Sequence, residues 1–186
     1  FVRPESGVAL VNGKSAGDAP SVARQQLAYL PENVALYPYL SGLENLAFFC
    51  ALAAIDLIRD RLHALLDAAG LQSQAHDANV ATYSKGMRQK VGLAIAHAKQ
   101  ARAMLLDEPT SGLDPSAADD FAQRIRAAAR NGMAVLMATH DLFNARQVAD
   151  RIGIMKEGRL VDEFPAQSID HDTLARVYLA HARDMP

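Results

Sequence analysis

The sequence predicts an α/β fold, and two apolar runs together with the stretches between them carry this prediction. The runs lie at residues 103–106, just before Asp107, and at residues 134–139, just before His140. Short continuous apolar runs are typical of strands that are buried on both faces of a parallel sheet. The stretches between strands carry apolar residues at helical spacing. We therefore expect one domain over residues 1–186 with a parallel-sheet core.

The first thirty residues favour strands over helices. Residues 7–11 and 26–30 are short apolar runs, and the Asn12-Gly13 pair is a turn signal. Pro31 is expected to end the second strand, because proline cannot donate to a sheet ladder.

Helices are expected to follow. Ser41 and Glu44 have the spacing of a capping box, so a helix should run from there to about Ala54. Asp56 is expected to cap a second helix, which Gly70 should stop because glycine readily takes the left-handed conformation.

These signals together predict an all-helical insert at residues 41–85 within the α/β core. Beyond the insert, helices and strands alternate. The expected elements are a helix after Ser84, a strand at 103–106, a helix at 116–130, a strand at 134–139, a helix at 141–149, a hairpin of strands 151–156 and 159–164 across Glu157-Gly158, and a helix at 173–183.

Composition excludes several classes of function. The net charge of −2 provides no positive field for a nucleic acid, so none is expected as a partner. The longest unbroken apolar run extends only from Leu46 to Ile55, well short of the ~20 residues that span a bilayer. The single cysteine, Cys50, permits no internal disulfide and fits a reducing compartment.

Asp107 and Glu108 are the first candidates for chemistry. They follow a predicted buried strand, and ligands of parallel sheets bind outside the carboxyl ends of the strands. Two carboxylates in such a place are costly to desolvate unless a metal or a proton-transfer role accompanies them. Taken alone, the pattern also fits a strand that ends in a solvated Asp-Glu turn.

Three motifs, in this order along the chain, resemble those of the ATP-binding cassette (ABC) ATPase family. They are SKGMRQK at residues 84–90, LLDEPTSGLDP at 105–115 and ATHD at 138–141. In the family these are the signature motif, the Walker B strand with its D-loop, and the switch histidine. The resemblance implies a P-loop NTPase-type ABC ATPase domain that binds ATP and Mg²⁺.

The resemblance also implies catalytic roles. Asp107 would hold Mg²⁺ through water, since this ion keeps several waters and takes few carboxylates. Glu108 would polarise the attacking water as general base. His140 would contact the γ-phosphate, although a histidine at the end of a strand is more commonly an ordinary surface residue.

The remaining motif residues are implied to bind nucleotide across a dimer. Ser84, Lys85 and Gly86 would serve the nucleotide of a second ATPase subunit, most simply in a homodimer. Asp114 would link the two sites. Lys85 replaces the commoner glycine, and would either add charge near the partner's phosphate or stay solvated. Glu32 replaces the commoner glutamine, and is expected to meet both the magnesium site and the membrane subunit.

The phosphate-binding loop motif GxxxxGK[ST] is missing from the sequence. Gly13-Lys14-Ser15 ends in the same way, but the required upstream glycine is replaced by Val8. The stretch that follows, residues 16–20, is not expected to start a helix aimed at phosphate. The resemblance then implies an N-terminally truncated chain that lacks the phosphate-loop strand and helix, exposes the faces they would cover, and is inactive alone.

The function implied is that of a cytoplasmic ATPase subunit, peripheral on the inner face of the cell membrane, which powers an exporter through a separate membrane permease. Glu32 and the Tyr-Ser-Lys-Gly-Met run are typical of ABC-2-type exporters. The run at residues 33–42, together with the run at residues 83–90, is similar to the ATPase subunit of copper-site maturation systems for nitrous-oxide reductase. A generic exporter of drug, polysaccharide or lipid is the alternative. A soluble ABC ATPase acting on ribosomes or DNA, and a non-catalytic remnant, also remain open.

Overall fold

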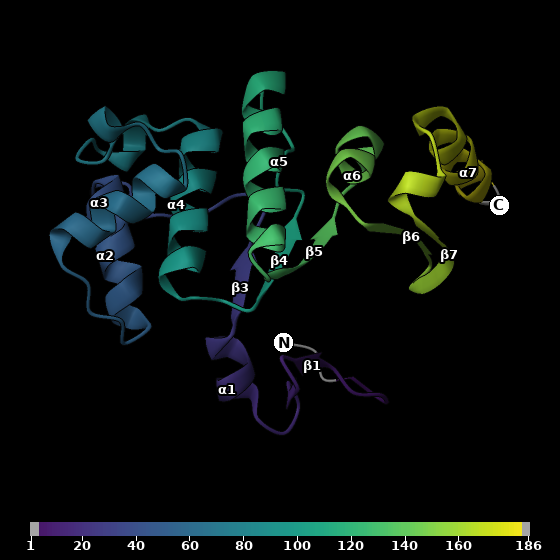
Figure 1. Ribbon diagram of the computed structural model, residues 1–186, viewed down its shortest axis with the longest axis horizontal. Helices are drawn as coiled ribbons and strands as arrows, with labels where there is room; N and C mark the ends of the chain where they lie inside the picture. Colours follow the sequence, from purple (N-terminus) through teal and green to yellow (C-terminus); the bar gives the residue numbers. More distant parts are fainter. Residues whose placement is uncertain (1–3, 184–186) are drawn as a thin grey trace. The chain divides into compact units, whose positions relative to one another are not determined.

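The structure is a computed structural model that describes residues 4–183. The chain divides into two compact units on either side of the Ala138–Thr139 bond, and each is taken by itself (Figure 1).

A small antiparallel hairpin opens the first unit. Its strands are β1 (Leu10–Val11) and β2 (Lys14–Ser15). Asn12 and Gly13 connect them with φ angles of 47° and 72°, which a two-residue type I′ turn requires. The predicted turn is therefore confirmed, whereas the strand predicted at residues 7–11 is too long.

Helix α1 (Pro20–Gln25) was not expected, because the first thirty residues favoured strands. Pro20 occupies its first turn, where the missing N–H of proline costs no helical hydrogen bond. Residues 16–20 therefore lead into a short helix. The helix begins well after Ser15, so the geometry of a strand running directly through a phosphate loop into a helix is still not met.

Three parallel strands form the sheet of the first unit, in the order β3-β4-β5. Their bounds are Leu27–Leu30, Ala103–Asp107 and Ala134–Ala138. The register places Tyr29, Leu105 and Leu136 side by side on one face. Leu30 and Leu106 lie on the opposite face, where both are buried.

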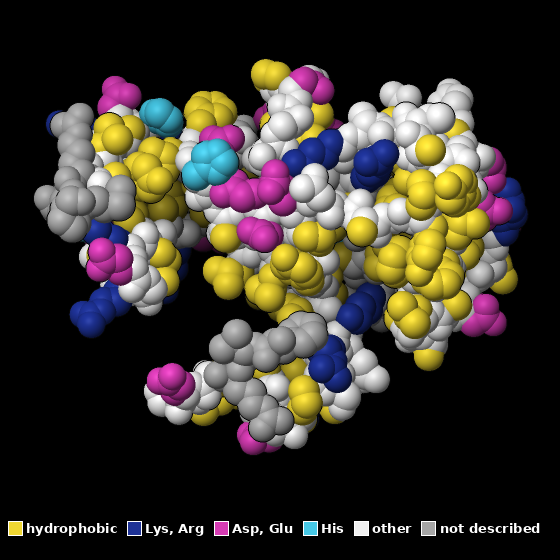
Figure 2. All heavy atoms as spheres, turned by 180° about the vertical axis from the view of Figure 1, so that it is seen from behind, with side chains coloured by type: hydrophobic (Ala, Val, Ile, Leu, Met, Phe, Trp, Pro, Cys, Tyr) yellow, Lys and Arg dark blue, Asp and Glu magenta, His cyan; other side chains and the backbone are white. Residues whose placement is uncertain are grey.

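Burial differs between the two predicted buried strands. In the central strand β4, Met104 and Leu106 are buried, as expected, and Leu105 is half-buried. Strand β5 is not buried: Leu136 is 69% exposed. The prediction was wrong for β5 because it lies at the edge of the described sheet and pairs there with β4 alone. Figure 2, the view from the side opposite to Figure 1, shows exposed hydrophobic side chains.

Residues 41–85 contain helices α2 (Gly42–Leu52) and α3 (Arg59–Ala68) and two short 3₁₀ turns, η1 (Ser73–Ala75) and η2 (Val80–Thr82). The predicted capping box at the start of α2 is confirmed. The Glu44 N–H donates to Ser41 Oγ at 3.1 Å, and the Ser41 N–H donates to Glu44 Oε2 at 2.7 Å.

Helix α3 begins later than predicted. Asp56 lies before the helix, and the N-cap is Ile58, which makes no capping bond through its side chain. The predicted stop is confirmed: Gly70 has a φ of 79°. The Leu71 N–H donates back to the Leu66 carbonyl at 3.0 Å, a contact typical of helix ends closed by a left-handed residue.

Helices α4 (Lys85–Ala98) and α5 (Pro115–Arg130) lie side by side. Gly92 allows α4 to approach the sheet closely, because a Cβ at this position would collide with Leu30 of β3. The buried side of α4 includes Val91 and Leu93. This packing fixes the direction of α4 against the strands.

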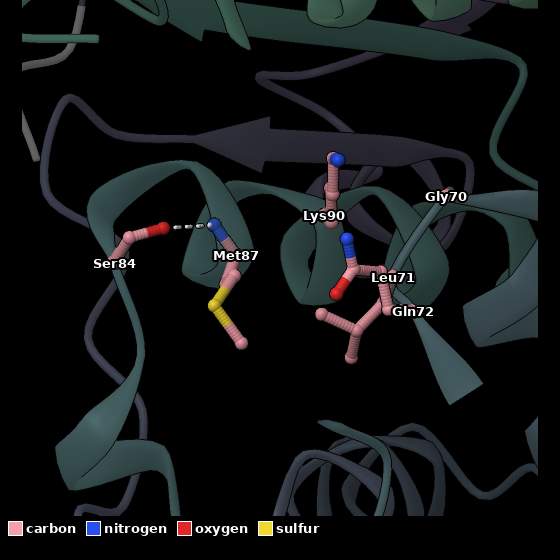
Figure 3. A pocket seen from close by; sticks show the side chains of 6 residues that line it. All are labelled: Gly70, Leu71, Gln72, Ser84, Met87 and Lys90. Carbon is pink, nitrogen blue, oxygen red and sulfur yellow. Dashed lines mark hydrogen bonds between the residues drawn. The ribbon is translucent and has the colours of Figure 1, made fainter. Parts of the chain in front are cut away.

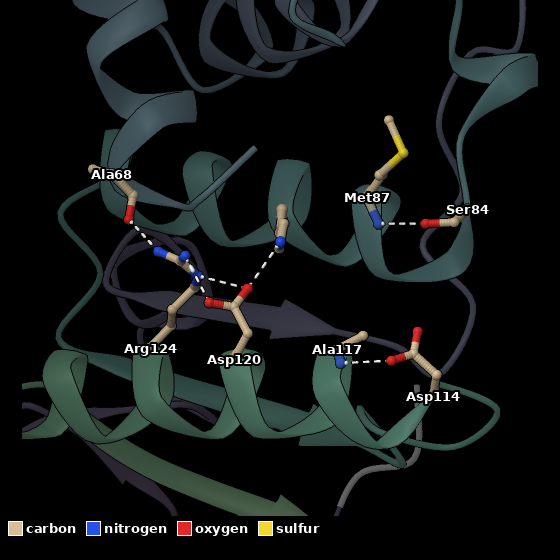
Figure 4. Close-up of polar contacts among 8 residues, drawn as sticks. Ala68, Ser84, Met87, Asp114, Ala117, Asp120 and Arg124 are labelled. Atoms are coloured by element: carbon tan, nitrogen blue, oxygen red, sulfur yellow. Dashed lines mark hydrogen bonds and ion pairs between the residues drawn. The ribbon is translucent and has the colours of Figure 1, made fainter. Parts of the chain in front are cut away.

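An ionic network joins α3, α4 and α5 (Figure 4). Asp120 of α5 accepts from Lys90 Nζ at 2.8 Å and from Arg124 at 2.8 Å. Arg124 also donates to the Ala68 carbonyl at 3.1 Å. Burial alone would raise the pKa of Asp120, but the hydrogen bonds and charges of Arg124 and Lys90 outweigh it and lower this pKa.

The second unit consists of a hairpin and helices. Its elements are α6 (Leu142–Val148), β6 (Arg151–Lys156), β7 (Arg159–Pro165), the 3₁₀ turn η3 (Ala166–Ser168) and α7 (His171–Arg183). The predicted hairpin across Glu157-Gly158 is confirmed, and α7 begins two residues earlier than predicted. Ile152, Ile169 and Leu174 are buried in a core of their own.

Of the helices described between residues 4 and 183, none is both long and apolar enough to cross a bilayer.

We expect Asp120→Asn to lower the free energy of unfolding by about 1 kcal/mol at neutral pH, the order of a partly exposed charge network. The folded pKa of Asp120 is lowered, so its contribution is present above the unfolded value of ~3.9 and is lost as pH falls through the folded pKa. Urea unfolding of both proteins between neutral pH and about pH 3 should therefore show a difference that shrinks with acid. Asp119→Asn, on the same helix, is the control. An equal loss in the control, or a pH-independent loss in Asp120→Asn, would contradict the prediction.

Candidate functional site

The two candidate carboxylates lie at the carboxyl end of the central strand β4. Asp107 is its last residue and is exposed, and Glu108 follows it and is half-buried. The Glu108 N–H donates to the Ala138 carbonyl at the end of β5, at 2.9 Å. The chain then turns, because the Ser111 N–H donates to the Glu108 carbonyl at 3.2 Å. The main chain at Glu108 is therefore held by sheet pairing on one side and by a turn on the other.

Glu108 has a left-handed backbone, with a φ of 43°. A residue other than glycine in this region carries strain of about 1–3 kcal/mol, and such residues cluster at functional sites. Among the other non-glycine residues with positive φ, Asn12 and Glu157 lie in hairpin turns, and Ala54 and Gln100 follow the ends of α2 and α4. Glu108 differs because it directly follows the central strand of a parallel sheet.

Tyr29 contacts the first carboxylate from the neighbouring strand. Its hydroxyl donates to Asp107 Oδ2 at 3.4 Å, a long hydrogen bond. Desolvation raises the pKa of Tyr29, and the negative charge and hydrogen bond of Asp107 raise it further. The sequence did not single out Tyr29, because the contact depends on the register of β3 against β4.

Magnesium is compatible with this arrangement. Among residues 4–183, no three His, Cys, Asp or Glu side chains converge into a metal-binding group. Mg²⁺ does not require such a cage, since it commonly takes one or two carboxylates together with water and substrate phosphate. Asp107 is an exposed carboxylate at the carboxyl end of a parallel strand, which fits that mode of binding.

The N-terminus of α4 presents the second group of candidate residues. Ser84 is the N-cap, and its hydroxyl accepts from the Met87 N–H at 3.2 Å. The first turn carries no acidic side chain, so the positive end of the helix dipole is not balanced from within the helix. Beside this turn lies a cavity of about 230 Å³ (Figure 3), lined by Gly70, Leu71, Gln72, Ser84, Met87 and Lys90. It is smaller than the roughly 300–1,000 Å³ of most small-molecule sites.

The structure brings two of the predicted site residues together. Lys85 Nζ lies 3.3 Å from Glu32 Oε1. The Ser111 hydroxyl donates to the same Glu32 oxygen at 3.1 Å. Sequence analysis did not find Ser111, because these partners lie 53 and 79 positions from Glu32 and no local pattern connects them.

Asp114 caps α5, and its side chain accepts from the Ala117 N–H at 2.9 Å. Gly86 lies against this segment, since a Cβ there would be 3.7 Å from both Leu113 and Ala117. Figure 4 shows the Ser84 and Asp114 N-caps at the same end of α4 and α5. Ser84, Gly86 and Asp114 are thus neighbours within the first unit.

His140 belongs to the second unit, where its side chain is exposed. The adjacent Asp141 N–H donates to Thr139 Oγ1 at 3.0 Å, and Asp141 caps α6 by accepting from the Asn144 N–H at 3.0 Å. These bonds give the residue-140 segment a defined local shape. The catalytic role of His140 remains a prediction.

Comparisons with known proteins agree on one family. The family described as ABC transporter matches residues 1–111. The uncharacterized ABC transporter ATP-binding protein YdbJ of Bacillus subtilis is 36% identical over 174 residues, which cover 93% of this chain and 56% of that protein. The daunorubicin/doxorubicin resistance ATP-binding protein DrrA of Streptomyces peucetius is 34% identical over 165 residues, covering 88% and 50% respectively. The chain therefore spans about half the length of these relatives.

Solved structures agree with this result. A structure described as the ATP binding subunit of an ABC transporter aligns with a TM-score of 0.79 and 28% identity, covering 96% of this chain and 78% of that one. The dimeric cassette MJ0796 bound to ADP and Pi aligns with a TM-score of 0.77, covering 89% and 75%. Its identity is 23%, so it shows the fold alone.

We expect Asp107→Asn to lower the pKa of the Tyr29 phenol toward its ordinary value, because the substitution removes the charge that disfavours the phenolate. An ultraviolet pH titration of the tyrosines, with Tyr29→Phe to assign the signal, measures this shift. An unchanged Tyr29 titration in Asp107→Asn would show that the two side chains do not interact in solution.

Proposed function

The chain belongs to the ABC transporter family, and on this premise we propose that it forms part of an ATP-hydrolysing subunit that powers an exporter through a separate membrane permease. The observation that supports the chemistry most is the pair Asp107 and Glu108 at the carboxyl end of the central strand β4, with the strained backbone at Glu108. Parallel sheets bind ligands at this edge.

In the proposed reaction Glu108 takes a proton from a water molecule, whose oxygen attacks the γ-phosphorus of ATP as ADP leaves. Asp107 would hold Mg²⁺ through water, and the ion, when bound, supplies charge neutralisation at the phosphates. His140 would donate a hydrogen bond to the γ-phosphate. Carboxylate general bases of this kind work by position, so the pairing that fixes Glu108 matters as much as its charge.

The proposal includes a second subunit. Ser84 and Gly86 would present the positive end of α4 to the nucleotide of that subunit, with Lys85 beside them. Asp114 would connect the two sites, and Glu32 would lie near the magnesium. MJ0796, which has the same fold, was solved as a dimer, and this supports a dimer here by fold analogy only.

The transported substrate would be selected by the permease. DrrA is named for resistance to daunorubicin and doxorubicin, and LnrL of Bacillus subtilis, 28% identical, for resistance to linearmycin. These names favour a drug-type exporter over copper-site maturation. The subunit would then work in the cytoplasm, peripheral on the inner face of the cell membrane.

Detergent extraction and affinity capture test the transport proposal. We expect a tagged chain, expressed in its source cell, to sediment with membranes and to be recovered with a polytopic membrane protein in a fixed ratio after extraction with detergent. The tag alone is the control. Recovery with ribosomes or DNA in place of a membrane protein would favour the soluble ABC ATPase.

We expect the isolated chain to show no ATP turnover, since its sequence holds no GxxxxGK[ST] motif. In an intact subunit that also carries this motif, Glu108→Gln should lower kcat by about 10²-fold or more, the usual contribution of a general base. Glu5→Gln, which changes an exposed carboxylate, is the matched control. Phosphate release by the isolated chain would refute the first expectation, and full turnover by the Glu108→Gln transporter would refute the role of Glu108.

A further inference from the structure

Glu32 is the meeting point of three segments that are far apart in the sequence. Lys85 from the first turn of α4 and Ser111 from the turn after β4 both contact Glu32 Oε1, at 3.3 and 3.1 Å. The backbone of Glu32 is held as well, because Gln89 Nε2 donates to its carbonyl at 3.1 Å. Gln89 is fully buried. The position of the Glu32 main chain is therefore fixed from inside, while its carboxylate reaches toward two other segments.

The ion pair of Glu32 with Lys85 compensates for an unfavourable charge at the start of α4. Lys85 is the first residue of α4, where a cation is unfavourable because the helix dipole is positive at this end. A carboxylate is favourable at the same place, and α4 has none in its first turn. Glu32, from another segment, pairs with the ammonium group of Lys85 at 3.3 Å. Its negative charge offsets the unfavourable cation in the first turn of α4.

The same lysine also lies beside the turn that follows Glu108. A Cβ placed on Gly112 would lie 3.9 Å from Lys85 Nζ. Gly112 has a φ of 68°, a conformation that glycine adopts without strain. The stem of Lys85 therefore passes close to the Ser111-Gly112 turn on its way to Glu32.

We propose that Glu32 and Lys85 form an ionic latch that holds the segment at residue 32, the N-terminus of α4 and the 108–113 turn in one arrangement, and that both are positioning residues in the nucleotide-free chain. Any effect on turnover rests on the proposed function, whereas the latch itself does not.

Hydrogen exchange on the nucleotide-free chain tests the latch. The reporters are the amides of Met87, Ser111 and Leu113, which are bonded within the latched segments. We expect Glu32→Gln and Lys85→Met each to speed their exchange about three-fold, the order expected of a partly exposed ion pair. The double variant should exchange no faster than either single variant, since both remove the same interaction.

The salt dependence of hydrogen exchange separates an ionic role of Glu32 and Lys85 from a role in packing alone. At about 1 M salt, where the screening length is ~3 Å, exchange in the wild type should approach that of Glu32→Gln, whereas the variants should change little. Asp77→Asn, which breaks the exposed Arg59–Asp77 pair elsewhere in the unit, is the matched control and should leave the reporters unchanged. Unchanged exchange in the single variants, or multiplicative effects in the double variant, would overturn the latch. Because no nucleotide is present, these outcomes are independent of whether the domain hydrolyses ATP.

Discussion

The parallel pairing of β4 with β3 and β5 is the constraint on which the rest of the first unit depends. It brings the carboxyl ends of the three strands together, and therefore determines where Asp107 and Glu108 lie. The pairing continues one residue past β4, since the Glu108 N–H still donates to Ala138 while its backbone has already turned to a left-handed conformation. Strand pairing and the turn together fix the main chain at Glu108 in a strained conformation.

Helix α4 depends on this sheet for its position and on other segments for its charge balance. Its Gly92 face packs on β3, while two of its cations turn to carboxylates outside the helix. Lys90 meets Asp120 of α5, and Lys85 meets Glu32. Each pair alone contributes little because it is partly exposed. Lys90 therefore joins α4 to α5, and Lys85 joins it to the segment that follows β3.

Sequence patterns predicted the structural features that depend only on residues close together in the chain. The Ser41–Glu44 capping box, the Gly70 stop and the Glu157-Gly158 hairpin were all predicted correctly, because each is settled within a few residues. The start of α3 was missed because Asp56 is only one of several residues able to precede a helix. Contacts across the fold could not be predicted: Tyr29 reaches Asp107 over 78 positions, and only the strand register determines that they meet.

The alternation of side chains along the strands separates a buried face from an exposed face. Leu30 and Leu106 are buried on the face that α4 covers, whereas Tyr29 and Leu136, on the other face, are 60% and 69% exposed. Asp107 lies two residues after Leu105 and so shares the exposed face. Asp107 is itself exposed there, beside the exposed Tyr29 and Leu136. Desolvation raises the pKa of Tyr29, and the charge and hydrogen bond of Asp107, which it contacts on this face, raise it further.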